Sequence, residues 1–561
     1  MQSHTGLTAK SPTAGQGDAT ASGRIPVDIR RFPWIRRLAS DYAFDYARLA
    51  DFFAGDARDT AAWRDAIGRA SRHRRQRDAV VQVLRAQQQR RGAPPIAQAT
   101  AAVLGDPASV AVVTGQQAGV FGGPLYTVFK AITAIQLARR VRATTGVEAV
   151  PVFWVDSEDH DWQEIRSARI LDKDANVVDI VSADPPGAGP HPVGGLEFDA
   201  GIGAAVDRLA EQLAPSEFTA DVLAALRRRY QTGASVGAAF AGWMDDLLGR
   251  HGLVVFESDD ASLKPLVADL FAHEIESRST SKLARKAADS MDQLGHTPQV
   301  VPADEAVALF YVDGAGRRGI KARGAELVIG DAVRSAADLK AEALAHPERF
   351  SPNVLLRPIV QDRIFPTVCY VSGPAELAYQ AQLGGVYREF GVEAPLLYSR
   401  ASATLADGAA MRFLERSSLA LETMHGQDDS VLNQWLANQL PAELERGIAE
   451  ADTLVSERID ALKASVSTID PTLAGAVDTT RDKMRETLKT LHSKIIQAAK
   501  RKDDTLRRQF VRTRALTFPE GVPQERSLNV VFFANRYGLN FADALLDSLP
   551  LETDKHYVLT L

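Results

Sequence analysis

Four consecutive polar residues, Glu158, Asp159, His160 and Asp161, are the clearest candidates for chemistry in this chain of 561 residues. They place three carboxylates and one imidazole shortly after the apolar run 150–155, which is followed by Asp156 and Ser157. Neighbouring negative charges repel one another unless a cation lies among them, such as a substrate ammonium group, Mg²⁺ or an arginine. Asp159, His160 or Asp161 could orient a nucleophile or accept its proton as a general base. In the alternative interpretation, His160 and one acid only cap the next helix.

The histidine content disfavours a transition-metal hydrolase. Catalytic zinc sites need several ligands at suitable spacing, and none of the 11 histidines forms a His-x-x-x-His pair. The single cysteine, Cys369, lies in a run of bulky residues, so a packed thiol is favoured over a nucleophile. We therefore assign no metal ligands.

A glycine-rich stretch at 114–124 is the second candidate site. Its glycines let a ligand approach the backbone closely, and the helix expected after it presents free N–H groups and the positive end of its dipole. An anion could bind there, or the glycines could serve only a tight connection, because the spacing matches neither the Rossmann fingerprint nor the P-loop. Two glutamines in the loop can donate and accept hydrogen bonds, which suits a polar small molecule. The candidate residues are Thr114, Gly115, Gln116, Gln117, Gly119, Gly122 and Gly123.

Two arginines are candidates for binding a carboxylate or a phosphate. Arg357 lies among apolar residues in the stretch 351–362, where its guanidinium could hold an anion through two parallel hydrogen bonds or pair with a buried acid. Arg400 and Ser402 follow another apolar run. A phosphate site and an ordinary loop are both consistent with that second pair.

The pattern of elements predicts a parallel α/β sheet. From 109 to 155 the chain alternates a β-branched run, the glycine-rich loop, a helical pattern over 125–141 and a second apolar run. Parallel strands joined by a right-handed crossover end at the same edge of a sheet, so the loop and the acidic cluster should face one crevice. Further apolar runs extend the predicted sheet at 253–256, 367–371 (followed by a helix over 375–390) and 395–398.

The chain also predicts a tail, a core and insertions. Residues 1–24 are rich in Ser, Thr, Gly and Ala, so we expect a disordered tail. Residues 25–439 contain the α/β core. Helical and mixed material is expected within the core at roughly 172–245 and 260–350, because these stretches lack the strand-loop-helix order.

The C-terminal part differs in kind. Residues 440–515 show apolar residues at three-four spacing, which predicts two long helices that fold back at Asp470-Pro471 as an antiparallel hairpin. Such an arm cannot bury both faces alone, so we expect a homodimer. Residues 516–561 should return to the main body, with strand and turn character at 528–533.

The composition excludes several classes of protein. With 45% hydrophobic and 24% charged residues the chain is that of a packed globular protein. Its formal net charge of −6 argues against nucleic acid as a partner. One cysteine rules out a disulfide framework, and no apolar run is long enough for a membrane span. We expect a cytoplasmic protein.

Five long stretches occur in the order found in a known family. They are VVTGQQAGVFGGPLYTVFKAI (112–132), PVFWVDSEDHDWQEI (151–165), SPNVLLRPIVQD (351–362), PTVCYVSGPAELAYQAQL (366–383) and LNVVFFANRYG (528–538). Together they resemble the bacillithiol biosynthesis cysteine-adding enzymes, the cysteine ligases of that pathway. The resemblance spans roughly residues 25–561.

The resemblance implies a fold and a reaction. The fold would be a Rossmann-like nucleotidyltransferase-type core with connecting-peptide insertions, akin to class I aminoacyl-tRNA synthetases, and a coiled-coil arm that makes a homodimer. The reaction would join the carboxyl of cysteine to the amine of glucosaminyl malate. Because amide formation from a carboxylate needs activation, we expect ATP as a substrate, with Mg²⁺ as a candidate ion. A metal-dependent hydrolase of an aminosugar conjugate and a non-catalytic dimeric scaffold are the alternatives.

The expected roles follow from these arguments. Catalysis is expected of Gln117, Asp159, His160 and Asp161. Binding of substrate or nucleotide is expected of Thr114, Gly115, Gln116, Gly119, Gly122, Gly123, Tyr126, Glu158, Asn353, Arg357, Gln361, Ser372, Gly373, Glu376, Arg400 and Ser402.

Overall fold

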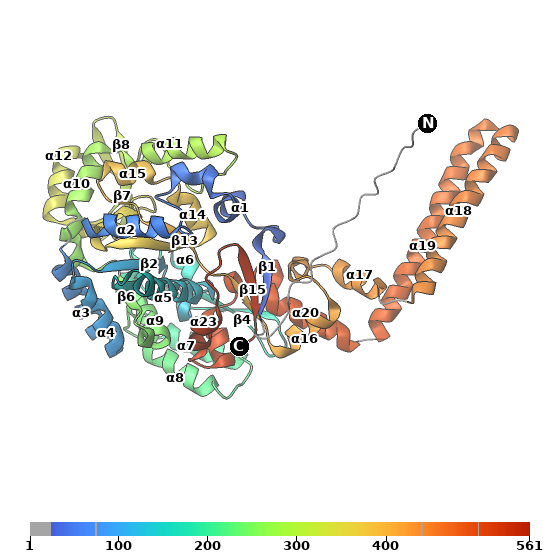
Figure 1. Cartoon of the computed structure of the whole chain (residues 1–561), viewed down its shortest axis with the longest axis horizontal. Coiled ribbons are helices and arrows are strands. Elements are labelled where there is room, and N and C mark those ends of the chain that lie inside the picture. The colour runs from blue at the N-terminus through green and yellow to red at the C-terminus, as the bar shows by residue number, and fades with distance from the viewer. Residues whose placement is uncertain (1–23, 73–75, 439–440, 503) are drawn as a thin grey trace, which may run out of the picture.

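A large body and a long helical arm make up the protein (Figure 1). This computed structural model describes residues 24–72, 76–438, 441–502 and 504–561. The expected tail at 1–24 lies outside the described residues, apart from Arg24. No helix among the described residues is both long enough and apolar enough to cross a membrane.

A five-stranded parallel sheet forms the centre of the body, as the sequence predicted. Its order is β13 (Leu396–Ser399), β12 (Thr367–Ser372), β2 (Val110–Gln116), β3 (Ala149–Val155) and β6 (Val254–Glu257). β2, which comes first in the chain among these five strands, therefore lies in the middle of the sheet. The strand order reverses between β2 and β12, and such a switch point opens a crevice at the carboxyl ends of the strands.

Both faces of this sheet are covered, which explains its nearly continuous apolar strands. On one face, Val110 and Val112 pack with α5 (Tyr126–Thr145) and α2 (Thr60–Arg72). Ala111 and Val113 point to the opposite layer. That layer also contains side chains of α3 (Arg77–Arg91) and α10 (Ala268–Ser277).

The expected helix at 375–390 is instead two helices, α14 (Pro374–Gln380) and α15 (Gly384–Glu389). Between them, Gln382 N and Leu383 N donate to carbonyls only three residues back. The amide of Gln382 is fully buried and bonds both the N–H and the carbonyl of Val300. This tertiary contact breaks the helix at a point that local propensity does not reveal.

A second, antiparallel sheet lies within the stretch expected as mixed material. Its order is β10 (Ala332–Ser335), β9 (Glu326–Ile329), β8 (Gly316–Arg323), β7 (Ala306–Asp313) and β11 (Phe350–Pro352). α10, α11 (Thr280–Gln293) and α12 (Ala336–Ala345) accompany it. From β11 the chain leads through a short turn into α13 (Arg357–Ile364), which borders the switch point.

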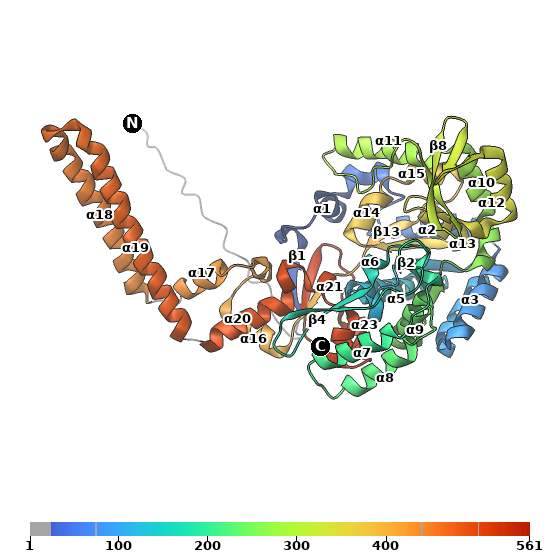
Figure 2. The ribbon, with the colours of Figure 1, turned by 180° about the vertical axis from the view of Figure 1, so that it is seen from behind.

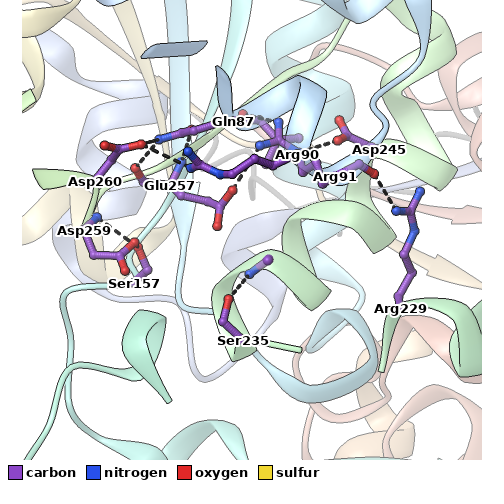
Figure 3. Close-up of polar contacts among 12 residues, drawn as sticks. Gln87, Arg90, Arg91, Ser157, Arg229, Ser235, Asp245, Glu257, Asp259 and Asp260 are labelled. Atoms are coloured by element: carbon purple, nitrogen blue, oxygen red, sulfur yellow. Dashed lines mark hydrogen bonds and ion pairs between the residues drawn. The ribbon is translucent and has the colours of Figure 1, made fainter. Parts of the chain in front are cut away.

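A buried ion-pair network fixes the outer strand β6 (Figure 3). Arg91 of α3 lies 2.5 Å from Asp245 of α9 (Val236–Leu248) and 3.1 Å from Glu257 at the end of β6. The side-chain amide of Gln87 both donates to the Glu257 carbonyl and accepts from its N–H at 3.0 Å. Because these groups are shielded from solvent, the network holds the N-terminal helices firmly against the sheet.

The C-terminal segment returns to the body, but the expected strand at 528–533 was wrong. These residues begin α22 (Val530–Tyr537), which Asn529 caps by accepting a hydrogen bond from Val531 N. Its apolar residues are buried on all sides, and a short run of this kind cannot be told from a strand by its pattern. The strand here is β15 (Lys555–Leu559), which pairs with β1 (Arg24–Asp28) and β14 (Ala403–Leu405).

The predicted antiparallel coiled-coil arm is confirmed. α18 (Ala442–Ile469) and α19 (Ala474–Lys502) lie side by side and project from the body (Figures 1 and 2). Pro471 opens the turn between them, and Asp470 accepts a hydrogen bond from Thr472 N. Ion pairs such as Lys463 with Asp478, at 2.7 Å, join the two helices.

Candidate active site

A cavity of about 290 Å³ lies at the carboxyl ends of β2 and β12, where the strand order reverses. We call it the sheet-end cavity. Its lining residues are Gly115, Gln116, Gln117, Tyr126, Lys130, Trp154, Asp156, Val354, Arg357, Tyr370, Gly373, Pro374, Ala375, Glu376, Tyr379, Arg400 and Arg526. Charges of both signs therefore surround a space suited to small polar reactants.

Lys130 and Glu376 form a buried ion pair in the wall of this cavity. Lys130 projects from α5, and its Nζ lies 2.7 Å from Glu376 Oε2 and 3.1 Å from Gln116 Oε1. Burial lowers the pKa of Lys130, which the Glu376 carboxylate opposes. Burial alone would raise the pKa of Glu376, but Lys130 and the hydrogen bonds from Gly373 N and Tyr370 hold it below its usual value. Lys130 lies among the apolar residues of α5, so its sequence context does not indicate a place in a site.

Arg357 offers a buried positive charge to this cavity. Its guanidinium donates to Gln361 Oε1 at 3.0 Å and to the Tyr379 hydroxyl at 3.2 Å, and lies near the ring of Trp154. In the part of the chain that the structure describes, no carboxylate forms an ion pair with Arg357. A buried cation with only neutral hydrogen-bond partners is well suited to receive an anionic ligand.

Asp156 is a second carboxylate in the lining of this cavity, besides Glu376. It follows β3 directly, two residues before the acidic cluster that the sequence drew attention to. Burial raises the pKa of the Asp156 carboxyl, Arg357 opposes that shift and Asp159 adds to it. The polar run in the sequence begins at this residue, so its place at the strand end was the signal that could have identified it.

The loop and the acidic cluster meet at the rim of the cavity. Gln117 Nε2 lies 2.7 Å from Asp159 Oδ2 and 2.9 Å from Glu164 Oε2. Arg317 of the antiparallel sheet reaches the same point, with Nη1 3.5 Å from Asp159 Oδ1 and 3.1 Å from His160 Nδ1. Because an arginine nitrogen only donates, His160 Nδ1 is the acceptor in a hydrogen bond with Arg317.

The other members of the acidic cluster have different surroundings. Asp161 caps α6 (Trp162–Ile165), accepting from Glu164 N at 3.1 Å, as in the capping interpretation. Glu158 is buried in an ion pair with Lys264 and does not line the sheet-end cavity. Burial raises the pKa of Glu158, and Lys264 opposes that rise.

Several expected binding residues make structural contacts outside the lining of the cavity. Thr114 Oγ1 donates to the Val371 carbonyl at 2.9 Å, and Asn353 Oδ1 accepts from the N–H groups that lead into α13. Gln361 donates to Asp362, and Ser372 accepts Arg400 N at its carbonyl. These contacts shape the walls of the cavity rather than its lining.

The glycine-rich loop borders a second cavity, of about 320 Å³, at the start of α5. Gly119 and Gly123 line it, and a Cβ on Gly119 would lie only 2.9 Å from the Gly123 Cα. At Gly122, where φ is +100°, a Cβ would meet the Trp243 ring. Gln116, Gln117, Tyr126 and Arg526 line both cavities, so the two spaces share one wall.

The C-terminal part completes that wall. Arg400 forms two parallel hydrogen bonds with Glu525 of α21 (Gln524–Ser527), at 2.6 and 2.9 Å, and both side chains are buried. Ser402 Oγ lies 3.1 Å from Glu525 and 2.7 Å from His556 Nδ1. The charge of Arg400 is therefore balanced by an internal acid, Glu525. Arg526, the residue that follows Glu525, lines the cavity.

These features define a Rossmann-like core with a ligand cavity at its switch point and a C-terminal coiled-coil domain. Two family models match the chain: the N-terminal Rossmann-like domain of bacillithiol biosynthesis BshC over residues 26–401, and its C-terminal coiled-coil domain over residues 403–561. The chain belongs to this family, which confirms the resemblance noted in the sequence.

Relatives of this family align over nearly the whole chain. A protein of Salinibacter ruber named "Putative cysteine ligase BshC" is 35% identical over 95% of this chain and 97% of its own. Proteins with the same name from Koribacter versatilis and Chlorobaculum tepidum are 32% and 30% identical, over 93% and 91% of this chain and 97% and 94% of their own.

The buried His556 predicts a loss of stability in acid. Burial lowers the pKa of His556 to about 4, against 6.5 when it is exposed in the unfolded chain. The neutral, buried imidazole therefore stabilises the folded protein fully above about pH 6.5. As the pH falls towards 4, the free energy of unfolding decreases by about 3 kcal/mol in total. We expect urea unfolding to show that the free energy of unfolding decreases less between pH 6.5 and 4 in His556→Asn than in the unchanged protein. The exposed His346→Asn should behave like the unchanged protein, and an equal acid loss in His556→Asn would contradict the assignment.

Proposed function

We propose that this protein joins the carboxyl group of cysteine to the amine of glucosaminyl malate, the last step of bacillithiol formation, and that ATP activates the carboxylate. The observation that carries the proposal is the sheet-end cavity, where Arg357 faces the same space as Asp156. Family membership and the name of the relatives support cysteine ligation. We place the reaction in the cytoplasm, where ATP and reduced thiols are available.

The proposed chemistry has two steps. A carboxylate oxygen of cysteine attacks a phosphoryl group of ATP, so a carbon–oxygen–phosphorus anhydride forms and a phosphate leaving group departs. The neutral amine of glucosaminyl malate then attacks the carbonyl carbon. A C–N bond forms, the C–O bond to the phosphoryl group breaks, and the amine gives up a proton.

The charges of the cavity suit these steps. Arg357, Lys130 and Arg526 would offset the charge of the carboxylate and phosphates. Asp156 would accept the proton of the amine, because its raised pKa makes it a stronger base than an exposed carboxylate. Gln117 and Asp159, joined at the rim with His160 nearby, would orient the amine.

Mg²⁺ would enter this site with the nucleotide. Among the described residues, no group of three His, Cys, Asp or Glu side chains is arranged to hold a metal ion. The phosphates of ATP are themselves good ligands for Mg²⁺, which keeps several waters and few protein ligands.

Mass spectrometry of the complete reaction tests the function. With cysteine, glucosaminyl malate, Mg²⁺ and ATP, we expect a thiol conjugate that forms only when ATP is present and consumed. Loss of glucosaminyl malate without any need for cysteine would show a hydrolase instead. Recovery of all reactants unchanged would favour the scaffold.

Two substitutions distinguish the candidate bases. We expect Asp156→Asn to lower kcat about 100-fold or more, because it removes the base but keeps the shape of the side chain. Asp289→Asn, on the exposed face of α11, should leave kcat unchanged. A full loss in His160→Ala with near-normal kcat in Asp156→Asn would instead make His160 the base.

We further propose a homodimer through the arm. No side chain of α18 is buried within the chain. Leu454 and Leu462 of this helix and Leu491 of α19 are about half exposed. A second copy could cover this apolar surface. Sedimentation should give a dimer that Leu462→Asp with Leu491→Asp converts to a folded monomer. A monomeric unchanged protein would contradict the proposal.

A further inference from the structure

A separate cavity of about 300 Å³ lies at the opposite end of the central sheet. Residues 394 and 395, which lead into the amino end of β13, form part of its lining. The sheet-end cavity lies at the carboxyl ends of the same parallel strands, so the two cavities do not belong to one site. We call this second space the distal cavity.

The distal cavity has hydrogen-bond donors that lack acceptors. Gln380 is 5% exposed, and no described group accepts from its Nε2. Arg69 Nη2 is likewise shielded and has no acceptor among the described residues. Both residues line the cavity. A shielded donor without a partner costs about 1–3 kcal/mol, so two of them beside one space indicate a ligand that supplies acceptor oxygens.

The remaining lining adds a second arginine, Arg388, two carboxylates and apolar surface. Asp51 and Glu393 supply carboxylates, and Glu393 Oε2 is 3.9 Å from Arg69 Nε, too far for a hydrogen bond. Phe52 and Phe53 supply apolar walls. A ligand with one carboxylate, one ammonium group and an apolar part would match all three features.

A chain of buried hydrogen bonds connects this cavity to the sheet-end cavity. Tyr387 lines the distal cavity, and its hydroxyl donates to Asp362 Oδ2 at 2.6 Å. Gln361 Nε2 donates to Asp362 Oδ1 at 2.9 Å, and Gln361 Oε1 accepts from Arg357 at 3.0 Å. A displacement of Tyr387 therefore has a continuous path to the arginine of the other cavity.

We propose that the distal cavity binds a free α-amino acid and that its occupancy changes the position of Arg357. Arg69 and Gln380 bind the carboxylate, and Asp51 and Glu393 bind the ammonium group. The inference goes beyond the proposed ligase reaction, since binding at this site does not require that reaction.

Binding to the full-length protein tests the site. We expect at least one of the 20 common amino acids to raise Tm and to give a measurable Kd by calorimetry. Arg69→Gln should weaken that Kd about tenfold, the effect of losing one charged hydrogen bond. Gln380→Leu, which keeps the bulk of the side chain, should also weaken it. Arg72→Gln, on the exposed face of the same helix, is the matched control and should change nothing.

The binding test of the distal cavity does not depend on whether the protein has ligase activity. No binding by any amino acid, or binding that Arg69→Gln and Gln380→Leu leave unchanged, would contradict the proposal. Where ligase activity is measurable, the bound amino acid should change the KM for cysteine about fivefold. Tyr387→Phe should still bind the amino acid, but the bound amino acid should no longer change the KM for cysteine. If the KM still changes about fivefold in this variant, the proposed coupling is wrong.

Discussion

The paired hydrogen bonds between Arg400 and Glu525 are the contact on which the proposed site depends. Arg400 follows the last strand of the central sheet, whereas Glu525 lies 125 residues later in the C-terminal part. Both are buried, and separating them would leave an uncompensated charge, which is strongly unfavourable. Because Arg526 follows Glu525 directly, the same contact places a further cation in the wall of the sheet-end cavity.

The parallel sheet then decides where the other polar groups gather. All five strands point the same way, so their polar ends meet at one edge. At that edge Asp156 follows β3, while Gly115 and Gln116 end β2. Lys130 and Arg357 reach the same place from helices, and their burial makes each charge act strongly on a bound reactant.

Much of this arrangement could be predicted from the sequence because it depends on local order. The strand, loop, helix and strand over 109–155 indicated a parallel pair, and the contact of Gln117 with Asp159 follows from that pairing. Asp470-Pro471 marked the turn of the coiled-coil arm for an equally local reason.

The remaining features depend on contacts between distant segments. Lys130 looked like one polar residue in an apolar helix, and only its ion pair with Glu376 of α14, far away in the sequence, shows its role. Residues 530–533 are all apolar, so their pattern does not distinguish a short helix from a buried strand. For Arg400 the sequence left a phosphate site and an ordinary loop open, and the acid that it binds, Glu525, is far away in the sequence.

A crystal structure of the protein with cysteine and glucosaminyl malate bound would test the central claim most directly. The account predicts that both molecules occupy the sheet-end cavity, with the cysteine carboxylate beside Arg357 and the sugar amine within reach of Asp156. Reactants bound elsewhere, with that cavity holding only water, would contradict it.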